Sequence, residues 1–147
     1  MKEIILELEW QYSLKDISWN ELFELYKMTL GSKKLSDIET AFTNSRFRCF
    51  VFEEGRIIAV GRALADGIDC SYICDIAVHP DFQGLGIGKQ IISKLVALSE
   101  GHKKIILYAR PGKELFYKKL GFMHMSTAMA IFEDQSKALN SGLLNEK

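Results

Sequence analysis

The stretch DFQGLGIGKQIISKL, residues 81–95, places a glycine at every second position from 84 to 88 and then continues as an apolar pattern with helical spacing. Glycine leaves the backbone N–H groups bare, and the N-terminus of a helix carries partial positive charge. A glycine-rich turn that leads into a helix is therefore typical of a site for a phosphate group. The structural alternative is a turn that only changes the direction of the chain, but such a turn seldom requires three glycines.

The spacing of this loop excludes two common phosphate motifs. The P-loop pattern G-x-x-x-x-G-K-[ST] would need a glycine at Gln83 and a hydroxyl at Gln90, so ATP binding of that type is excluded. The dinucleotide pattern G-x-G-x-x-G fails because Lys89 takes the place of its third glycine. That pattern also opens the first strand–helix unit of a fold, whereas this loop lies past the middle of the chain. Coenzyme A remains as the third candidate.

The composition limits the class of protein. The 147 residues are enough for one domain with its own core, and 48% of them are hydrophobic. The 19 basic and 19 acidic residues balance, which predicts no attraction to nucleic acid or to an anionic membrane. Three cysteines without a CxxC spacing predict a reducing compartment, which we expect to be the cytoplasm, and no metal site. The N-terminus alternates like a strand rather than a signal peptide, and no apolar run approaches the ~20 residues of a membrane span.

Hydrophobic periodicity and turn signals predict the secondary structure. Strands are expected at 4–10, at two places within 46–67 joined at Glu54-Gly55, at 70–80, at 103–109 as a buried strand, at 122–125 and at 127–132; helices are expected at 18–30, 36–45, 86–99 and 113–120. This order predicts an α/β (α+β) sandwich with a mixed, mostly antiparallel sheet of about seven strands flanked by about four helices. We expect residues 1–132 to form a single domain and the polar residues 133–147 to form a partly disordered tail.

Two segments carry a family resemblance. Gln83–Gly88 form a Q-x-x-G-x-G loop after a strand that ends AVHP, and LFYKKLGF (115–122) follows one strand later. In this order the two resemble the pyrophosphate loop and the F-Y-x-x-x-G-F segment of the GNAT superfamily of acetyl-CoA-dependent N-acetyltransferases. The resemblance covers residues 46–132 and implies the GNAT fold, in which two central strands splay apart. The stretch GRALADG (61–67) resembles a subset that includes plant serotonin N-acetyltransferase-like proteins and indicates no substrate.

The resemblance implies a site for acetyl-CoA as cosubstrate, and no metal. Backbone amides of the loop and of the first helical turn would hold its pyrophosphate. The main chain of the strand DIAVHP would bond its pantetheine arm, and the Ile76 N–H would polarise the thioester carbonyl. The residues implied in cofactor binding are Ile76, Ala77, Val78, Gln83, Gly84, Leu85, Gly86, Ile87, Gly88, Lys89 and Phe116, and Phe116 is also a candidate for packing.

Two residues are candidates for the acid–base steps. Tyr117 occupies the family position of a general acid, since a neutral phenol can donate a proton to the departing thiolate; a core tyrosine at a helix end is the alternative. Asp75 is the one carboxylate in an otherwise apolar strand, which predicts a raised pKa and a role as general base. Hydrogen bonding of Asp75 to backbone is the alternative. Strand alternation would place Asp75 with Ile73 on one face and Tyr72 with Cys74 on the other.

These features predict an N-acetyltransferase that transfers acetyl directly, in a ternary complex, to a primary amine of a small molecule or peptide. A non-catalytic coenzyme A-binding sensor or protein-interaction module is the alternative, because the sequence contains no obvious base. We expect no nucleic-acid partner and no membrane partner, and a homodimer is compatible with the sequence. Arg62, in mid-strand, could meet an acidic substrate group or form a surface ion pair.

Overall fold

The computed structural model describes residues 7–146 and divides after Leu107 into two compact units. The first unit contains a sheet with helices on both faces, and the second contains two short helices. The domain boundary expected after residue 132 stays a prediction. In the described part of the chain, no helix combines the length and the apolar character that crossing a membrane requires.

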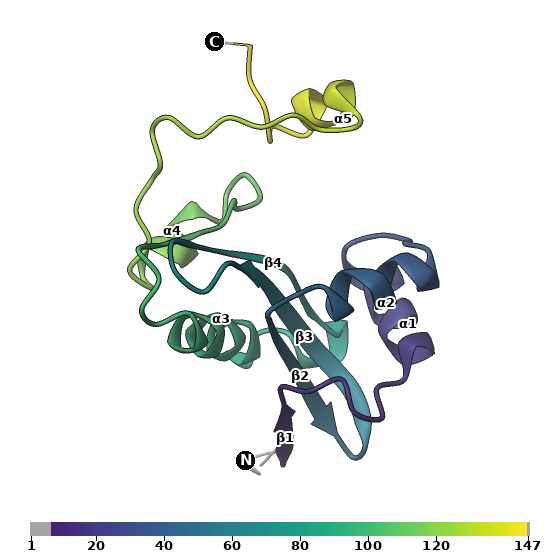
Figure 1. Cartoon of the computed structure of the whole chain (residues 1–147). Coiled ribbons are helices and arrows are strands. Elements are labelled where there is room, and N and C mark those ends of the chain that lie inside the picture. Colours follow the sequence, from purple (N-terminus) through teal and green to yellow (C-terminus); the bar gives the residue numbers. More distant parts are fainter. Residues whose placement is uncertain (1–6, 147) are drawn as a thin grey trace, which may run out of the picture. The chain divides into compact units, whose positions relative to one another are not determined.

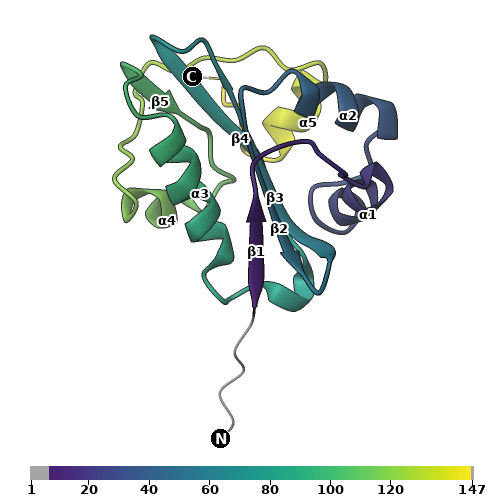
Figure 2. The same ribbon diagram turned by 60° about the horizontal axis from the view of Figure 1, so that its bottom comes forward.

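Five strands form the sheet of the first unit, and their order across the sheet is their order along the chain. Figure 1 labels β1 to β4, and Figure 2 also labels β5. Neighbouring strands are antiparallel except β4 and β5, which are parallel. The predicted mixed, mostly antiparallel sheet is confirmed, although the described chain has five strands where about seven were expected. The strands are β1 Leu8–Gln11, β2 Phe47–Glu53, β3 Arg56–Ala65, β4 Cys70–Val78 and β5 Lys104–Ile106. Residues 4–6 of the first predicted strand lie outside the described residues.

Two helices cover one face of this sheet and a third covers the other (Figure 2). α1 (Trp19–Thr29) begins after Ser18, whose hydroxyl accepts the Glu21 N–H at 3.3 Å, the cap expected of a serine at this position. α2 (Leu35–Thr43) follows, and both helices bury apolar residues against the sheet. This core contains Leu22, Leu25, Tyr26, Ile38, Phe42, Phe50, Val60 and Ala77. The opposite face is covered by α3 (Ile87–Leu98), whose inward side is also apolar.

Gly61 lets α3 lie close to β3. A Cβ at this position would lie 2.6 Å from Ile76 Cδ1 and 2.7 Å from Ile91 Cγ2, far inside ordinary contact distances. Gly61→Ala should therefore lower the free energy of unfolding by about 1–3 kcal/mol, the usual cost of overpacking a core. Urea denaturation of the variant beside wild type measures this loss. An unchanged midpoint would mean that the two isoleucines move aside freely.

β5 pairs with only the beginning of β4. The parallel ladder joins Cys70–Tyr72 to Lys104–Ile106, and β4 then continues to Val78 without a partner strand on that side in the described chain. The ladder between β4 and β5 therefore ends at Tyr72, and the expected splay of two central strands stays a prediction. β5 is shorter than the strand predicted at 103–109, and it is not buried: Lys104 is exposed and the two following residues are half-buried.

The second unit contains α4 (Glu114–Lys118) and α5 (Gln135–Asn140). The strands predicted at 122–125 and 127–132 are wrong, because residues 108–146 contain no strand. An isolated strand pair is marginal in water without a further sheet or helix against which to pack, and this unit contains no sheet. α5 adds one helix to the number predicted and lies within the stretch expected as a tail. Asp134 caps α5 by accepting the Lys137 N–H at 3.0 Å, and Ala138 is buried.

Candidate functional site

The glycine loop follows β4 through the 3-10 turn Pro80–Phe82 and ends where α3 begins. Gly84 and Gly86 have φ values of +80° and +82°, and no atom lies within 4 Å of a Cβ built at either position. This left-handed conformation favours glycine. A Cβ at Gly88 would lie 3.7 Å from Val78 Cγ2, an ordinary contact, and its φ is not in the left-handed region. The loop conformation therefore requires Gly84 and Gly86, whereas the described fold leaves room for a side chain at Gly88.

The first turn of α3 presents backbone amides beside this loop. Gly86 is the N-cap, no side chain of the described chain caps the helix there, and the first helical hydrogen bond runs from the Gln90 N–H to the Gly86 carbonyl at 3.1 Å. The N–H groups of Ile87, Gly88 and Lys89 accordingly have no acceptor within the helix. An anion in front of this turn would be stabilised by these donors and by the helix dipole.

The loop is anchored at both of its ends. Gln83 Nε2 donates to the Val78 carbonyl at 3.0 Å, which ties the loop to the end of β4. The Ile87 side chain is buried, whereas Leu85 at the tip is exposed. Gln83 and Leu85 stay predictions as cofactor-binding residues, and the structure gives Gln83 a structural role in holding the loop.

The main-chain groups of β4 alternate in direction beyond the end of the ladder with β5. The His79 N–H donates to the Ile58 carbonyl of β3 at 2.7 Å. Because successive amides of a strand point to opposite sides, the Ala77 N–H also points toward β3, and the Ile76 and Val78 N–H groups point away from it. On that side the ladder with β5 has already ended. Ile76 and Val78 therefore offer N–H donors on the side where β4 has no partner strand in the described chain. The Ala77 N–H faces β3, so the predicted contact of Ala77 with a cofactor has no backbone donor on that side.

A β-bulge at Asp75 interrupts the alternation of side chains along β4. The register with β3 shifts between Val60, which pairs with Ala77, and Arg62, which pairs with Cys74. Asp75 lies in the bulge and has a φ of +55°. The extra residue moves the side chains that follow it to the opposite face. Cys74 and Asp75 consequently both lie near Arg62, and the prediction that they occupy opposite faces is wrong.

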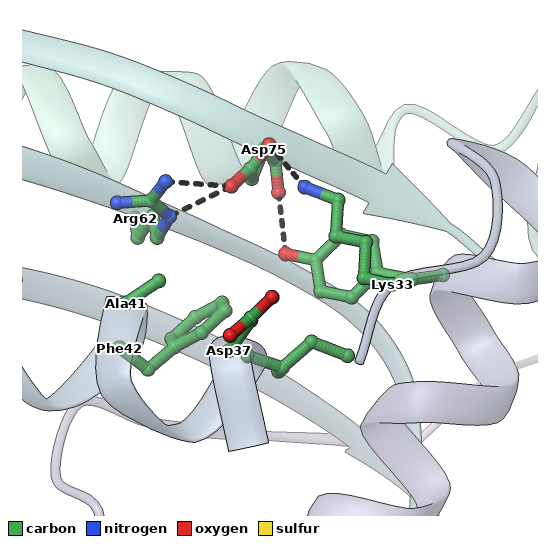
Figure 3. Close-up of a pocket in the computed structure, with 8 residues that line it drawn as sticks. Lys33, Asp37, Ala41, Phe42, Arg62 and Asp75 are labelled. Carbon is green, nitrogen blue, oxygen red and sulfur yellow. Dashed lines mark hydrogen bonds and ion pairs between the residues drawn. The ribbon is translucent and has the colours of Figure 1, made fainter. Parts of the chain in front are cut away.

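Asp75 is held by side chains from three other parts of the first unit (Figure 3). Arg62 Nε and Nη2 each lie 2.8 Å from Asp75 Oδ2, and Lys33 Nζ lies 3.1 Å from Oδ1. The hydroxyl of Tyr26 donates to the backbone carbonyl of Asp75 at 2.9 Å. One of the two roles predicted for Arg62 was a surface ion pair. Arg62 does form an ion pair, with Asp75, but the pair is largely buried, because the exposed fractions of the side chains are 14% for Arg62 and 20% for Asp75.

The pKa of Asp75 is lowered, not raised as predicted. Burial, the largest single influence, raises this pKa, but the charges and hydrogen bonds of Arg62 and Lys33 together bring it below the usual aspartate value. The carboxylate therefore has little tendency to take a proton near neutral pH. The candidate role of Asp75 as general base loses its physical reason, and the carboxylate binds two cations rather than backbone.

A pocket of about 130 Å³ adjoins this cluster (Figure 3). It is lined by Tyr26, Lys33, Asp37, Ile38, Ala41, Phe42, Arg62 and Asp75. Aromatic and aliphatic walls are thus combined with two cations and two carboxylates. No motif of the sequence points to Lys33, which lies 42 residues from Asp75. The isolated charges of Arg62 and Asp75, each in mid-strand, were the available signal for the rest of the cluster.

Two cysteine thiols of the first unit are poor nucleophiles. Burial raises the pKa of Cys74 to about 11 and the pKa of Cys49 to about 12, although Arg62 and Lys94 respectively act in the opposite direction. Both thiols are therefore protonated near neutral pH, and the thiolate is the reactive form.

Tyr117, in the second unit, lies on α4 between two aromatic rings. Its ring meets those of Phe116 and Phe122 edge to face, with centroid distances of 5.0 and 6.1 Å. Burial raises the pKa of Tyr117, with Arg110 acting against this rise. The phenol is accordingly protonated at neutral pH, which is the form that a proton donor requires. Phe116 is 39% exposed, so one side of this ring is open to a ligand.

The chain was compared with known protein families and curated relatives. A model of the GNAT acetyltransferase domain matches residues 45–124, more than half of the chain. The uncharacterized N-acetyltransferase ycf52 of Pyropia yezoensis is 34% identical over 118 residues, which are 76% of this chain and 68% of that protein. The chloroplastic serotonin N-acetyltransferase 2 of Oryza sativa subsp. japonica is 41% identical over 70 residues, which are 46% of this chain and only 35% of the rice protein.

Solved structures share the fold. A GNAT family acetyltransferase from Streptococcus pneumoniae TIGR4 has a TM-score of 0.74 at 18% sequence identity, and the match covers 88% of this chain and 99% of that chain. A sequence identity of 18% supports a shared fold and indicates no substrate.

Proposed function

The chain belongs to the GNAT family of acetyltransferases, and from this premise we propose that it transfers the acetyl group of acetyl-CoA directly to a primary amine of a small molecule or peptide. The observation that carries the proposal is the coincidence of two features at the end of β4. The strand turns the Ile76 and Val78 N–H groups to the side where it has no partner strand in the described chain, and the first turn of α3 leaves the amides of Ile87–Lys89 without an acceptor in the helix. The strand amides would bind the polar pantetheine arm, and the helix amides would bind the pyrophosphate.

Backbone donors would bind acetyl-CoA. The amides at the start of α3 suit its pyrophosphate, because they combine unpaired N–H groups with the positive end of a helix. Gly84 and Gly86 leave open space beside the backbone on the approach to these amides. The Val78 N–H suits the amide carbonyls of the pantetheine arm, and the Ile76 N–H suits the thioester carbonyl, whose oxygen gains negative charge as the amine attacks.

Proton transfer would involve Tyr117 and solvent. The phenol of Tyr117, kept protonated by its raised pKa, donates to the departing thiolate. The amine must arrive unprotonated, and Asp75 does not supply the base, because its carboxylate already accepts from Arg62 and Lys33. Water accepts the proton of the amine in this mechanism. The protonated thiols of Cys49 and Cys74 favour direct transfer over an acyl-cysteine intermediate.

The pocket beside Asp75 is the proposed entrance for the acceptor. Phe42, Ile38 and Ala41 offer an apolar wall, and Asp37 offers a carboxylate that can accept a hydrogen bond from the neutral amine. Its volume of about 130 Å³ suits the amino end of a small molecule or a peptide terminus rather than a whole large substrate. The name of the rice relative adds arylalkylamines to the compounds worth testing.

Ligand-dependent melting tests the cofactor. Acetyl-CoA at about a hundred times its dissociation constant should stabilise the protein by about 2.7 kcal/mol and raise the melting temperature by roughly 5–10 °C. ATP and NAD should not raise it, since the loop matches neither of their motifs. No response to millimolar coenzyme A would contradict the proposed cofactor.

A panel of primary amines tests the reaction. Amines that include arylalkylamines, diamines, amino acids and short peptides are incubated with acetyl-CoA, and release of the coenzyme A thiol is measured. At least one amine should increase thiol release above the hydrolytic background and yield the acetylated product by mass spectrometry. Tight binding of coenzyme A without any acetylated amine would instead support a coenzyme A sensor.

A further inference from the structure

The bulge at Asp75 sets the direction of the Ile76 N–H. Asp75 is one of three non-glycine residues with positive φ in the described chain, at +55°, a conformation that costs free energy for a residue with a side chain. If β4 ran on regularly through Asp75, with no bulge, the amides that follow would point to the other side of the strand. The Ile76 N–H would then point toward β3 and not to the side on which this part of β4 has no partner strand in the described chain.

Three side chains converge on this bulge from elements far apart in the sequence. We call the set of Tyr26, Lys33 and Arg62 around Asp75 the Asp75 clamp. Tyr26 comes from α1, is 1% exposed and binds the Asp75 carbonyl, whereas Lys33 precedes α2 and Arg62 comes from β3, and both bind the carboxylate. The clamp thus restrains the backbone and the side chain of the same strained residue.

The clamp is itself anchored in the core. Arg62 Nη1 lies 3.2 Å from Ser45 Oγ, and the Ser45 hydroxyl donates to the Ala41 carbonyl of α2 at 2.7 Å. The Arg62 guanidinium also lies over the Phe42 ring, at 5.9 Å from its centroid. Both oxygens of Asp75 and the guanidinium therefore have partners within the protein, which is the arrangement of a structural support rather than of a proton acceptor.

We propose that the Asp75 clamp is a positioning device that holds the bulge so that the Ile76 N–H points at the thioester carbonyl of bound acetyl-CoA. The inference rests on the proposed function, because it assumes that this amide meets that carbonyl. Asp75 and Tyr26 are then positioning residues for the reaction, and neither touches the reacting atoms. Lys33, with 36% of its side chain exposed, forms the most exposed of the three contacts and should contribute least.

Two matched pairs of variants test the clamp. Tyr26→Phe removes only the hydroxyl that binds the Asp75 carbonyl. Its control is Tyr12→Phe, which removes the hydroxyl of a tyrosine that is 40% exposed. Asp75→Asn keeps two polar atoms and tolerates the left-handed conformation, whereas Asp75→Ala loses the side-chain contacts and adapts poorly to positive φ. Melting temperatures identify any variant that fails to fold.

The first readout compares acetyl-CoA with CoA and needs no turnover. Only acetyl-CoA has the thioester carbonyl, so wild type should bind it about 2–10-fold more tightly than CoA, the value of one hydrogen bond. The Ile76 amide signal in a ¹⁵N–¹H NMR spectrum should shift more with acetyl-CoA than with CoA. Tyr26→Phe and Asp75→Ala should reduce both differences, while Tyr12→Phe and, for the most part, Asp75→Asn should retain them.

The second readout is the rate with an accepted amine. Tyr26→Phe and Asp75→Ala should lower kcat by roughly 10-fold, a part of the ~10²-fold loss that follows removal of an oxyanion donor. The KM for acetyl-CoA should rise by no more than the roughly 2–10-fold of binding lost in the first readout. Asp75→Asn should retain most of the wild-type kcat, unlike Asp75→Ala. If Asp75→Asn and Asp75→Ala lose kcat equally, while the acetyl-CoA preference and the Ile76 signal stay as in wild type, Asp75 is a base and the inference is overturned.

The remaining outcomes separate the clamp from the proposed function. If wild type responds to acetyl-CoA at Ile76 and Tyr26→Phe responds as Tyr12→Phe does, the clamp does not position this amide. If wild type itself does not distinguish acetyl-CoA from CoA at Ile76, the proposed carbonyl donor is wrong and the inference falls with it.

Discussion

Tyr117→Phe should lower kcat for an accepted amine by ~10²-fold or more, the usual scale for loss of a general acid. Phenylalanine keeps the ring and its edge-to-face contacts with Phe116 and Phe122, so the melting temperature and the affinity for CoA should change little. The loss should appear in kcat more than in KM, because the proton is needed chiefly in the transition state. Steady-state measurement of thiol release with the best amine of the panel gives both constants.

The pH dependence provides an independent check on Tyr117. A general acid must be protonated, and burial raises the pKa of this phenol above the usual tyrosine value of about 10. The kcat of wild type should therefore rise as the amine loses its proton and should not fall again below about pH 10. Tyr12→Phe is the control for removal of a hydroxyl. Wild-type turnover by Tyr117→Phe would mean that water protonates the thiolate.

Gly88→Ala should weaken CoA binding by about 10–100-fold, because its methyl group stands where a phosphate would approach the first turn of α3, and a hydrogen bond to a charged group contributes about 1.5–3 kcal/mol. The fold should accept the change. The new Cβ lies at an ordinary 3.7 Å from Val78 Cγ2, and alanine stabilises a helix by up to about 1 kcal/mol relative to glycine. Isothermal titration calorimetry measures the affinity, and thermal unfolding measures the stability.

The choice of Gly88 separates ligand binding from loop geometry. Gly86→Val would weaken binding for two reasons at once, since φ at Gly86 is +82° and valine strains that conformation. Ser93→Ala, on the exposed side of α3, is the control for adding helix propensity away from the loop. Unchanged affinity in Gly88→Ala would show that the glycines serve only the path of the chain.

Local signals were sufficient for much of the first unit. The helical spacing of apolar residues within 18–30 predicted α1, and the Glu54-Gly55 turn predicted the hairpin of β2 and β3. Glu54 and Gly55 both have positive φ, at +50° and +75°, which suits a tight hairpin turn. The spacing of Gly84, Gly86 and Gly88 likewise predicted a glycine loop that leads into a helix. Such features arise between neighbours in the chain, so a sequence contains them.

Partner-dependent features were predicted poorly. The apolar stretches 122–125 and 127–132 alternate like strands, yet residues 108–146 contain no strand, because a strand needs a ladder that its own residues cannot supply. The bulge in β4 has no local signal either. Its single extra residue moved Asp75 to the side of Cys74 and reversed the predicted arrangement of the two faces.

The sequence by itself determined the class of fold, the glycine loop before α3 and the family, because each depends on short-range spacing and on motifs that can be counted along the chain. Only the tertiary structure decided the state of Asp75. Its partners lie 49, 42 and 13 residues away, at Tyr26, Lys33 and Arg62, and an isolated carboxylate in an apolar strand predicts the opposite pKa shift. Electrostatic interactions depend on distance in space, and folding alone brought these charges to within about 3 Å of each other.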